Sequence, residues 1–189
     1  MAQESNTSMK IVNGFNIPTT ISKESQDKLE IMFATDERQN RSATSTPTDF
    51  DGWKKLQVET ENSVVPQIKK LVDNFGADIE SKQMGSVNVI DIKPKDYTDN
   101  GKVIVYTHGG GYILYSANST LLGPVIVANT TGVRVISIDY TLAPFSKWDK
   151  TTDEIISVID ELIKKHGYDL NDIAMYGDSA GGAITLALY

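Results

Sequence analysis

Apolar residues recur at helical spacing through the first 76 residues. They lie three or four positions apart in the charged segment 22–40 and again in 50–62, which predicts a helix in each. A third helix is expected to begin near Pro66, a residue tolerated in a first turn, and to end at Gly76. Residues 1–76 are therefore predicted to form a helical unit.

After residue 76 the pattern changes to short apolar runs and alternating segments, which predict strands. Helical spacing returns between them, and Thr151 with Glu154 matches a capping box at the start of one helix that Gly167 would end. The expected strands are 78–83, 87–92, 102–107, 133–138 and 173–176, and the expected helices are 119–130, 151–165 and the segment from Ala180 onward. Alternating strands and helices predict an α/β fold, a mainly parallel sheet flanked by helices, over residues 77–189.

Composition narrows the possible functions. A length of 189 residues suits one domain or part of one. A net charge of −7 argues against binding to nucleic acid or to an anionic membrane, and no apolar run approaches the roughly 18 residues of a membrane span. With no cysteine and only two histidines, neither a metal nor another cofactor is expected. We expect a cytoplasmic protein whose partner is a small molecule.

The segment Gly177-Asp178-Ser179-Ala180-Gly181 matches the pattern G-x-S-x-G, in which glycines allow a sharp turn that presents a nucleophilic serine. Alone, the pattern also fits a plain strand-to-helix turn. Its setting is more specific, because an apolar strand precedes it and a predicted helix follows it. These are the surroundings that a nucleophile turn requires.

A second motif, His108-Gly109-Gly110-Gly111, directly follows the strand expected at 102–107. Consecutive glycines leave backbone N–H groups uncovered, and such donors can stabilise the oxyanion that forms during acyl transfer. A flexible turn is the alternative for this motif alone. Both motifs together, in one βαβ chain, favour acyl-transfer chemistry at a hydroxyl.

These segments resemble the hormone-sensitive-lipase-like esterases of the α/β-hydrolase fold. The matching residues, in the order and spacing of that family, are 108–112 (HGGGY), 139–144 (DYTLAP) and 177–182 (GDSAGG). The resemblance covers essentially the whole chain and implies that residues 1–76 are a cap over the acyl pocket. The chain departs from the family at Thr141, where Arg is usual, and at Phe145, where Glu is usual.

The resemblance implies that Ser179 is the nucleophile and that the N–H groups of Gly109, Gly110 and Ala180 form the oxyanion hole. It gives supporting roles in the glycine loop, the substrate pocket or the helix start to four neighbours: His108, Gly111, Tyr112 and Asp178. The implied reaction is hydrolysis of short-chain carboxylic esters.

In this fold the acid and the histidine of the triad follow the serine. Residues 180–189 contain no Asp, Glu or His, and His166 is expected to cap the preceding helix. We therefore expect the N-terminal part of a longer esterase, inactive alone, with the C-terminal part of the fold absent and acting as its partner. Two alternatives stay open: a small-molecule receptor on the same fold, and an inert fragment.

Overall fold

The computed structural model describes residues 10–34 and 46–188, which divide into two compact units between Thr46 and Pro47. The described part of the first unit is a hairpin of β1 (Lys10–Val12) and β2 (Phe15–Ile17), followed by α1 (Lys23–Ala34). The helix expected over 22–40 is thus confirmed to residue 34, and 35–40 lie outside the described residues.

Sequence analysis did not predict the hairpin of the first unit. Its signal is the pair Asn13-Gly14, which turns the chain with positive φ values of 48° and 80°. The rings of Phe15 and Phe33 stack with their centroids 4.5 Å apart, so an aromatic contact joins the hairpin to α1.

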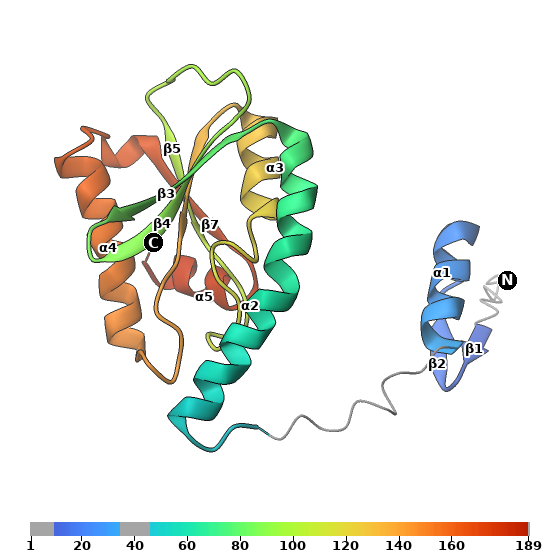
Figure 1. Cartoon of the computed structure of the whole chain (residues 1–189). Helices are drawn as coiled ribbons and strands as arrows, with labels where there is room; N and C mark the ends of the chain where they lie inside the picture. Colours follow the sequence, from blue (N-terminus) through green and yellow to red (C-terminus); the bar gives the residue numbers. More distant parts are fainter. Residues whose placement is uncertain (1–9, 35–45, 189) are drawn as a thin grey trace, which may run out of the picture. The chain divides into compact units, whose positions relative to one another are not determined.

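The second unit contains a five-stranded sheet in the order β3-β4-β6-β5-β7. Its elements in chain order are α2 (Phe50–Val72), β3 (Asp78–Met84), β4 (Val87–Lys93), β5 (Val103–Thr107), α3 (Leu122–Thr131), β6 (Arg134–Ile138), α4 (Trp148–Lys164), β7 (Ile173–Gly177) and α5 (Ser179–Leu188). Strands β6, β5 and β7 are parallel, whereas β3 and β4 extend the sheet in antiparallel pairings. This mixed sheet, covered on both sides, confirms the α/β class (Figure 1).

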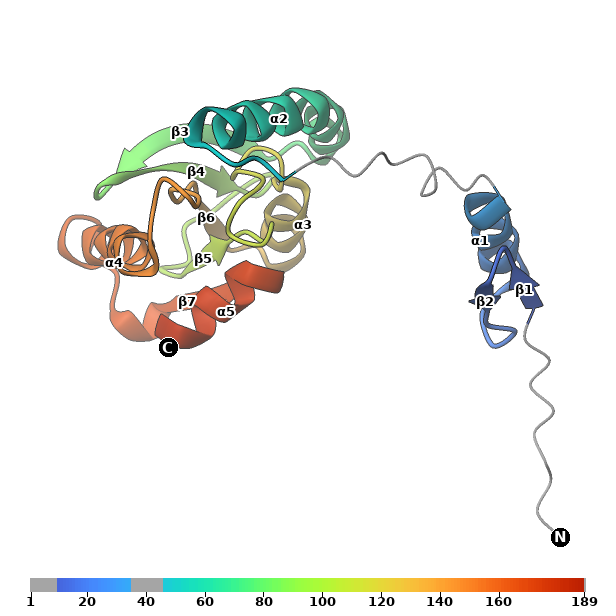
Figure 2. The ribbon, with the colours of Figure 1, turned by 90° about the horizontal axis from the view of Figure 1, so that it is seen from below.

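Helices cover both faces of the sheet, α2 and α3 on one and α4 and α5 on the other (Figure 2). The first layer packs around Val125, Ala128 and Val135, and the second around Ile136, Ile155 and Leu162. Because both faces are covered there, β5 and β6 are the continuous apolar runs that the sequence displays. Within the described sheet, β7 forms one edge.

The expected helices at 50–62 and from Pro66 onward are one helix, α2. The predicted break was wrong because Pro66 and Asn62 are both exposed. Pro66 has no N–H for the Asn62 carbonyl, but solvent can satisfy that carbonyl, so the helix continues. The expected ends at two glycines agree with the structure. Gly76 ends the 3-10 turn Asp73–Phe75 that follows α2, and Gly132 ends α3, both in the left-handed conformation.

The predicted capping box was also wrong. Helix α4 begins at Trp148, one turn earlier than expected, which places Thr151 and Glu154 inside it. The Thr151 hydroxyl pairs with Ser146 Oγ at 2.9 Å, and Glu154 accepts hydrogen bonds from Thr141. Both side chains therefore bind the preceding loop rather than the helix start.

By its contacts α2 belongs to the second unit, together with the sheet. The role of residues 1–76 as a cap, and the division at residue 76, stay predictions. None of the helices in the two described ranges combines the length and apolar character that crossing a membrane requires.

Candidate active site

Ser179 stands at a sharp turn between β7 and α5, where the sequence predicted a nucleophile. The side chain is exposed, and the backbone φ is +48°, a left-handed conformation that a serine seldom adopts. Such strain costs of order 1–3 kcal/mol and persists only where surrounding contacts hold it. Only Asp178 separates the serine from the strand, and Asp178 O accepts from Gly182 N at 3.2 Å in the first helical turn.

Close packing against the end of β5 holds this turn. A Cβ atom on Gly181 would collide with the carbonyl oxygens of Thr107 and His108, and one on Gly177 would collide with Gly181. The Thr107 hydroxyl donates to Gly181 O at 2.8 Å and contacts Thr185 Oγ1 at the same distance. The glycines of the motif are therefore required for the approach of α5 to β5.

His108 is fully buried and forms the base of the glycine loop. Its ring stacks on Tyr140 with centroids 4.2 Å apart, and the Tyr140 hydroxyl donates to His108 O at 2.6 Å. The His108 Nδ1 atom lies 2.7 Å from Gly109 O, and since a carbonyl only accepts, Nδ1 carries the proton. Burial lowers the pKa of His108 despite this hydrogen bond, so the ring is a neutral packing group.

One oxygen of Asp178 connects the two motifs. Asp178 Oδ1 accepts the Tyr106 hydroxyl at 2.6 Å and the Gly109 N–H at 2.9 Å. Burial and this carboxylate both raise the pKa of the Tyr106 phenol, which stays a protonated donor. The Gly109 N–H is thus already paired. The N–H groups of Gly110 and Ala180 have no acceptor among residues 46–188, so they are the available donors of the predicted set.

The segment after the glycine loop borders two pockets. Tyr112 packs edge-on against Trp148 with centroids 6.1 Å apart and lines a pocket of about 360 Å³. A second pocket, of about 450 Å³, lies beneath α2 and is lined by Gln57 and Leu142 among others. Gly111 turns the loop toward Tyr112 with a φ of +63°.

Helix α2 is attached to the loops that follow β5 and β6. The Gln57 side-chain amide donates to Ile113 O at 2.9 Å and to Ala143 O at 3.0 Å. Glu61, one turn later, accepts from the hydroxyls of Ser116 and Ser119. These contacts keep α2 over the carboxyl ends of the strands from which the glycine loop emerges.

The two departures from the family pattern are both accommodated locally. Thr141 donates from its N–H and its hydroxyl to the Glu154 carboxylate, each at 2.7 Å. The Phe145 ring lies 5.7 Å from that of Phe50 on α2, and it remains 39% exposed. An apolar contact therefore stands where the family usually has a charged side chain.

His166 follows the last turn of α4, as expected. Its Nε2 lies 4.0 Å from Glu161 Oε1 on the same helix, and its backbone N–H bonds Glu161 O. The partners of His108 and His166 are thus loop and helix groups, and within residues 46–188 neither ring is hydrogen-bonded to Ser179.

Sequence analysis missed Tyr106, Glu61 and Gln57. Tyr106 occupies an ordinary buried strand position, and Glu61 and Gln57 occupy ordinary polar helix positions. Their partners lie 72, 55 and 56 residues away along the chain, so periodicity carries no signal for them.

Comparison with known proteins supports the α/β-hydrolase fold and likeness to esterases. Residues 104–189 match a family model described as the α/β-hydrolase fold. An esterase of Gibberella moniliformis is 31% identical over 145 residues, which cover 74% of this chain and 42% of the relative. The crystal structure of esterase E25 matches with a TM-score of 0.75 over 90% of this chain and 52% of that chain; at 22% identity it supports the fold alone.

The crystal structure of an esterase from the bacterial hormone-sensitive lipase family has 26% identity and a TM-score of 0.57, covering 76% of this chain and 46% of that one. The chain thus spans about two fifths to one half of the length of these relatives. Fold, motif order and relatives agree. The chain therefore has the α/β-hydrolase fold over the matched segment and is similar to esterases of the hormone-sensitive-lipase type.

Proposed function

We propose that this chain carries the nucleophile and the oxyanion-hole donors of a carboxylic-ester hydrolase that acts on short-chain acyl esters. The observation that carries the proposal is the exposed Ser179 in a strained turn at the start of α5, packed against the end of β5. A hydroxyl held in this way at a helix N-terminus suits attack on a carbonyl carbon.

In the proposed reaction, Ser179 Oγ attacks the acyl carbon, and the carbonyl oxygen takes up negative charge. The N–H groups of Gly110 and Ala180 receive that oxygen, and each donor is expected to contribute roughly 10²- to 10³-fold in rate. The alcohol then departs, and water releases the acyl group from the serine. Tyr112 is proposed to line the site that accepts the acyl group.

A serine needs a base to take its proton. His108 is buried and bonded within the glycine loop, and His166 interacts with Glu161, which supports the proposal that neither supplies the base. We propose that this chain alone has no appreciable esterase activity. The partner that would complete it is a C-terminal segment of the same fold that brings an acid and a histidine.

The test measures turnover of p-nitrophenyl acetate by the purified 189-residue chain and by the chain extended with the segment that follows it in its gene. We expect no turnover by the first. The extended chain is expected to turn over the ester and to lose that activity in Ser179→Ala. Turnover by the short chain that Ser179→Ala abolishes would overturn the proposed inactivity.

The paired state of both histidines also supports a second candidate, a small-molecule receptor that keeps the serine turn without a catalytic base. The two candidates differ in the extended chain. If its later histidine position holds another residue and the extended chain binds an ester without turnover, the receptor is correct. An inert fragment is the remaining alternative, and it predicts no cooperative thermal transition by circular dichroism.

A further inference from the structure

Two tyrosines lie side by side where β5 and β7 approach the candidate site. Tyr106 and Tyr176 are partners in the parallel register, and their ring centroids are 4.7 Å apart at an interplanar angle of 34°. Tyr106 is 4% exposed, and its hydroxyl has Asp178 Oδ1 as a partner. The Tyr176 hydroxyl has none in residues 46–188. The two rings are thus neighbours, and of the two phenols only Tyr106 donates a hydrogen bond to Asp178.

The Tyr106 bond ends on the oxygen that also accepts the Gly109 N–H. A single carboxylate oxygen therefore joins β5, the glycine loop and the residue next to Ser179. Hydrogen bonds to an ionised carboxylate are shorter and stronger than those between neutral groups, and the 2.6 Å O–O distance agrees with this. With Tyr106 in place, rotation of the Asp178 side chain would break this part-buried bond.

The backbone next to Gly109 is also fixed by hydrogen bonds. Gly110 has a φ of +119°, and its carbonyl oxygen accepts from Leu114 N at 3.0 Å and from Ile113 N at 3.2 Å. The loop is therefore fixed on both sides of the Gly110 N–H, by Asp178 before it and by the following turn after it.

We propose that Tyr106 is a positioning residue of the oxyanion hole. Its hydroxyl fixes the Asp178 carboxylate, the carboxylate holds the Gly109 N–H, and Gly110 and Ala180 remain as the two donors. This inference rests on the proposed function for its catalytic meaning, whereas the linkage itself is a property of the folded chain.

The experiment measures amide hydrogen exchange by ¹⁵N NMR on the 189-residue chain, with Tyr106→Phe compared with Tyr176→Phe. Both variants remove one phenol oxygen from the same ring pair. We expect exchange at Gly109 to rise by roughly 10- to 100-fold in Tyr106→Phe, the equivalent of one hydrogen bond to a charged group, together with a shift of the Gly110 resonance. Tyr176→Phe is expected to change neither. The proposal is wrong if Gly109 is unchanged in Tyr106→Phe, or if both variants affect it equally.

A second pair of variants separates the linkage from general loss of stability. Asp178→Asn keeps an acceptor oxygen for the Gly109 N–H and is expected to retain slower exchange there than Asp178→Ala, which removes the acceptor. Equal rates in these two variants would contradict the proposal even if Tyr106→Phe failed to fold. Ser179→Ala is expected to leave Gly109 exchange unchanged. Since no arm requires turnover, absence of esterase activity would not affect the outcome.

Discussion

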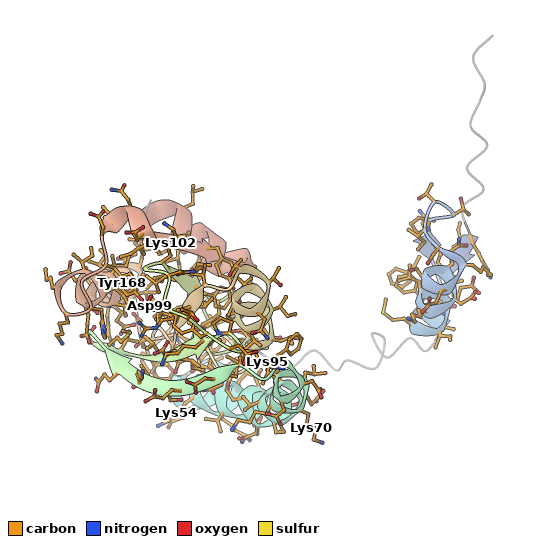
Figure 3. All side chains as sticks on the ribbon, turned by 90° about the horizontal axis from the view of Figure 1, so that it is seen from above. Lys54, Lys70, Lys95, Asp99, Lys102 and Tyr168 are labelled. Carbon is orange, nitrogen blue, oxygen red and sulfur yellow. The ribbon has the colours of Figure 1, made fainter. Side chains whose placement is uncertain are left out.

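The ion pair between Asp91 on β4 and Arg134 on β6 is expected to be the most costly side-chain interaction to break in the second unit. Asp91 is 1% exposed and accepts from Arg134 Nε at 2.7 Å and from Nη2 at 2.9 Å, and Lys82 Nζ lies 2.8 Å from Oδ2. Arg134 also donates to the hydroxyl of Tyr168, which is labelled in Figure 3. The carboxylate is thus held by three charge-assisted bonds.

Asp91→Ala would leave the Arg134 guanidinium, whose side chain is only 11% exposed, without a counter-charge. Lys82 would lose less, because it is more exposed and retains Glu80 at 2.9 Å. An unpaired buried charge costs about 3–5 kcal/mol, a large share of the roughly 5–15 kcal/mol that stabilises a typical domain. Asp91→Leu combined with Arg134→Met removes both charges and is expected to destabilise the fold less than Asp91→Ala alone.

Urea unfolding followed by circular dichroism measures these differences in the free energy of unfolding. The control is Lys102→Ala, which breaks an exposed pair with Asp172 and is expected to cost about 0–1 kcal/mol. The reasoning would be refuted if Asp91→Ala cost no more than Lys102→Ala, or if the double variant were less stable than Asp91→Ala.

Two further predictions concern pH and packing. Burial raises the pKa of Asp91, but the hydrogen bonds from Arg134 and Lys82 outweigh it and hold the pKa below its ordinary value. This stabilisation is therefore present above the unfolded pKa of about 3.9 and is lost as the pH falls through the lower folded pKa. We expect the urea concentration at the unfolding midpoint to decrease when the pH is lowered below about 4. The decrease is expected to be smaller in Asp91→Asn. Gly181→Ala is expected to disrupt the serine turn and lower the melting temperature strongly, because the new Cβ meets the backbone carbonyls of Thr107 and His108. Gly123→Ala, in α3 with open space around its Cβ position, should instead raise stability by about 0.5–1 kcal/mol, and comparable losses in both variants would contradict this account.

Local patterns were sufficient to predict most elements, and they failed where distant contacts decide. The apolar runs of β5 and β6 identify buried strands because both faces of the sheet are covered. The break expected at Pro66 failed because the freed carbonyl faces solvent. The capping box at Thr151 failed because a loop ten residues earlier takes up its hydroxyl.

In the candidate site, the glycine motifs were predictable from the sequence, and the hydrogen bonds between distant residues were not. The two glycine motifs identify Ser179 and the loop at His108. Only glycine allows the backbone to approach so closely, so this structural requirement is visible in the sequence as glycine residues. The pairing of Gly109 with Asp178 could not be inferred, since those residues are 69 apart and either could have faced solvent. Tyr106 was equally hidden, because a buried tyrosine in a strand is ordinary until its hydroxyl partner is known.

The parallel pairing of β5 with β7 sets where the serine stands. Thr107 is opposite Gly177, so the glycine loop and the serine turn leave the sheet at the same level. A slip of β7 by one residue would move Ser179 about 3.3 Å along the strand direction and reverse which side chains face each layer. Displacements of about 1 Å can already cost 10²-fold in rate. Mutations in the buried strands, far from any reacting group, would therefore affect chemistry through strand register as well as through stability.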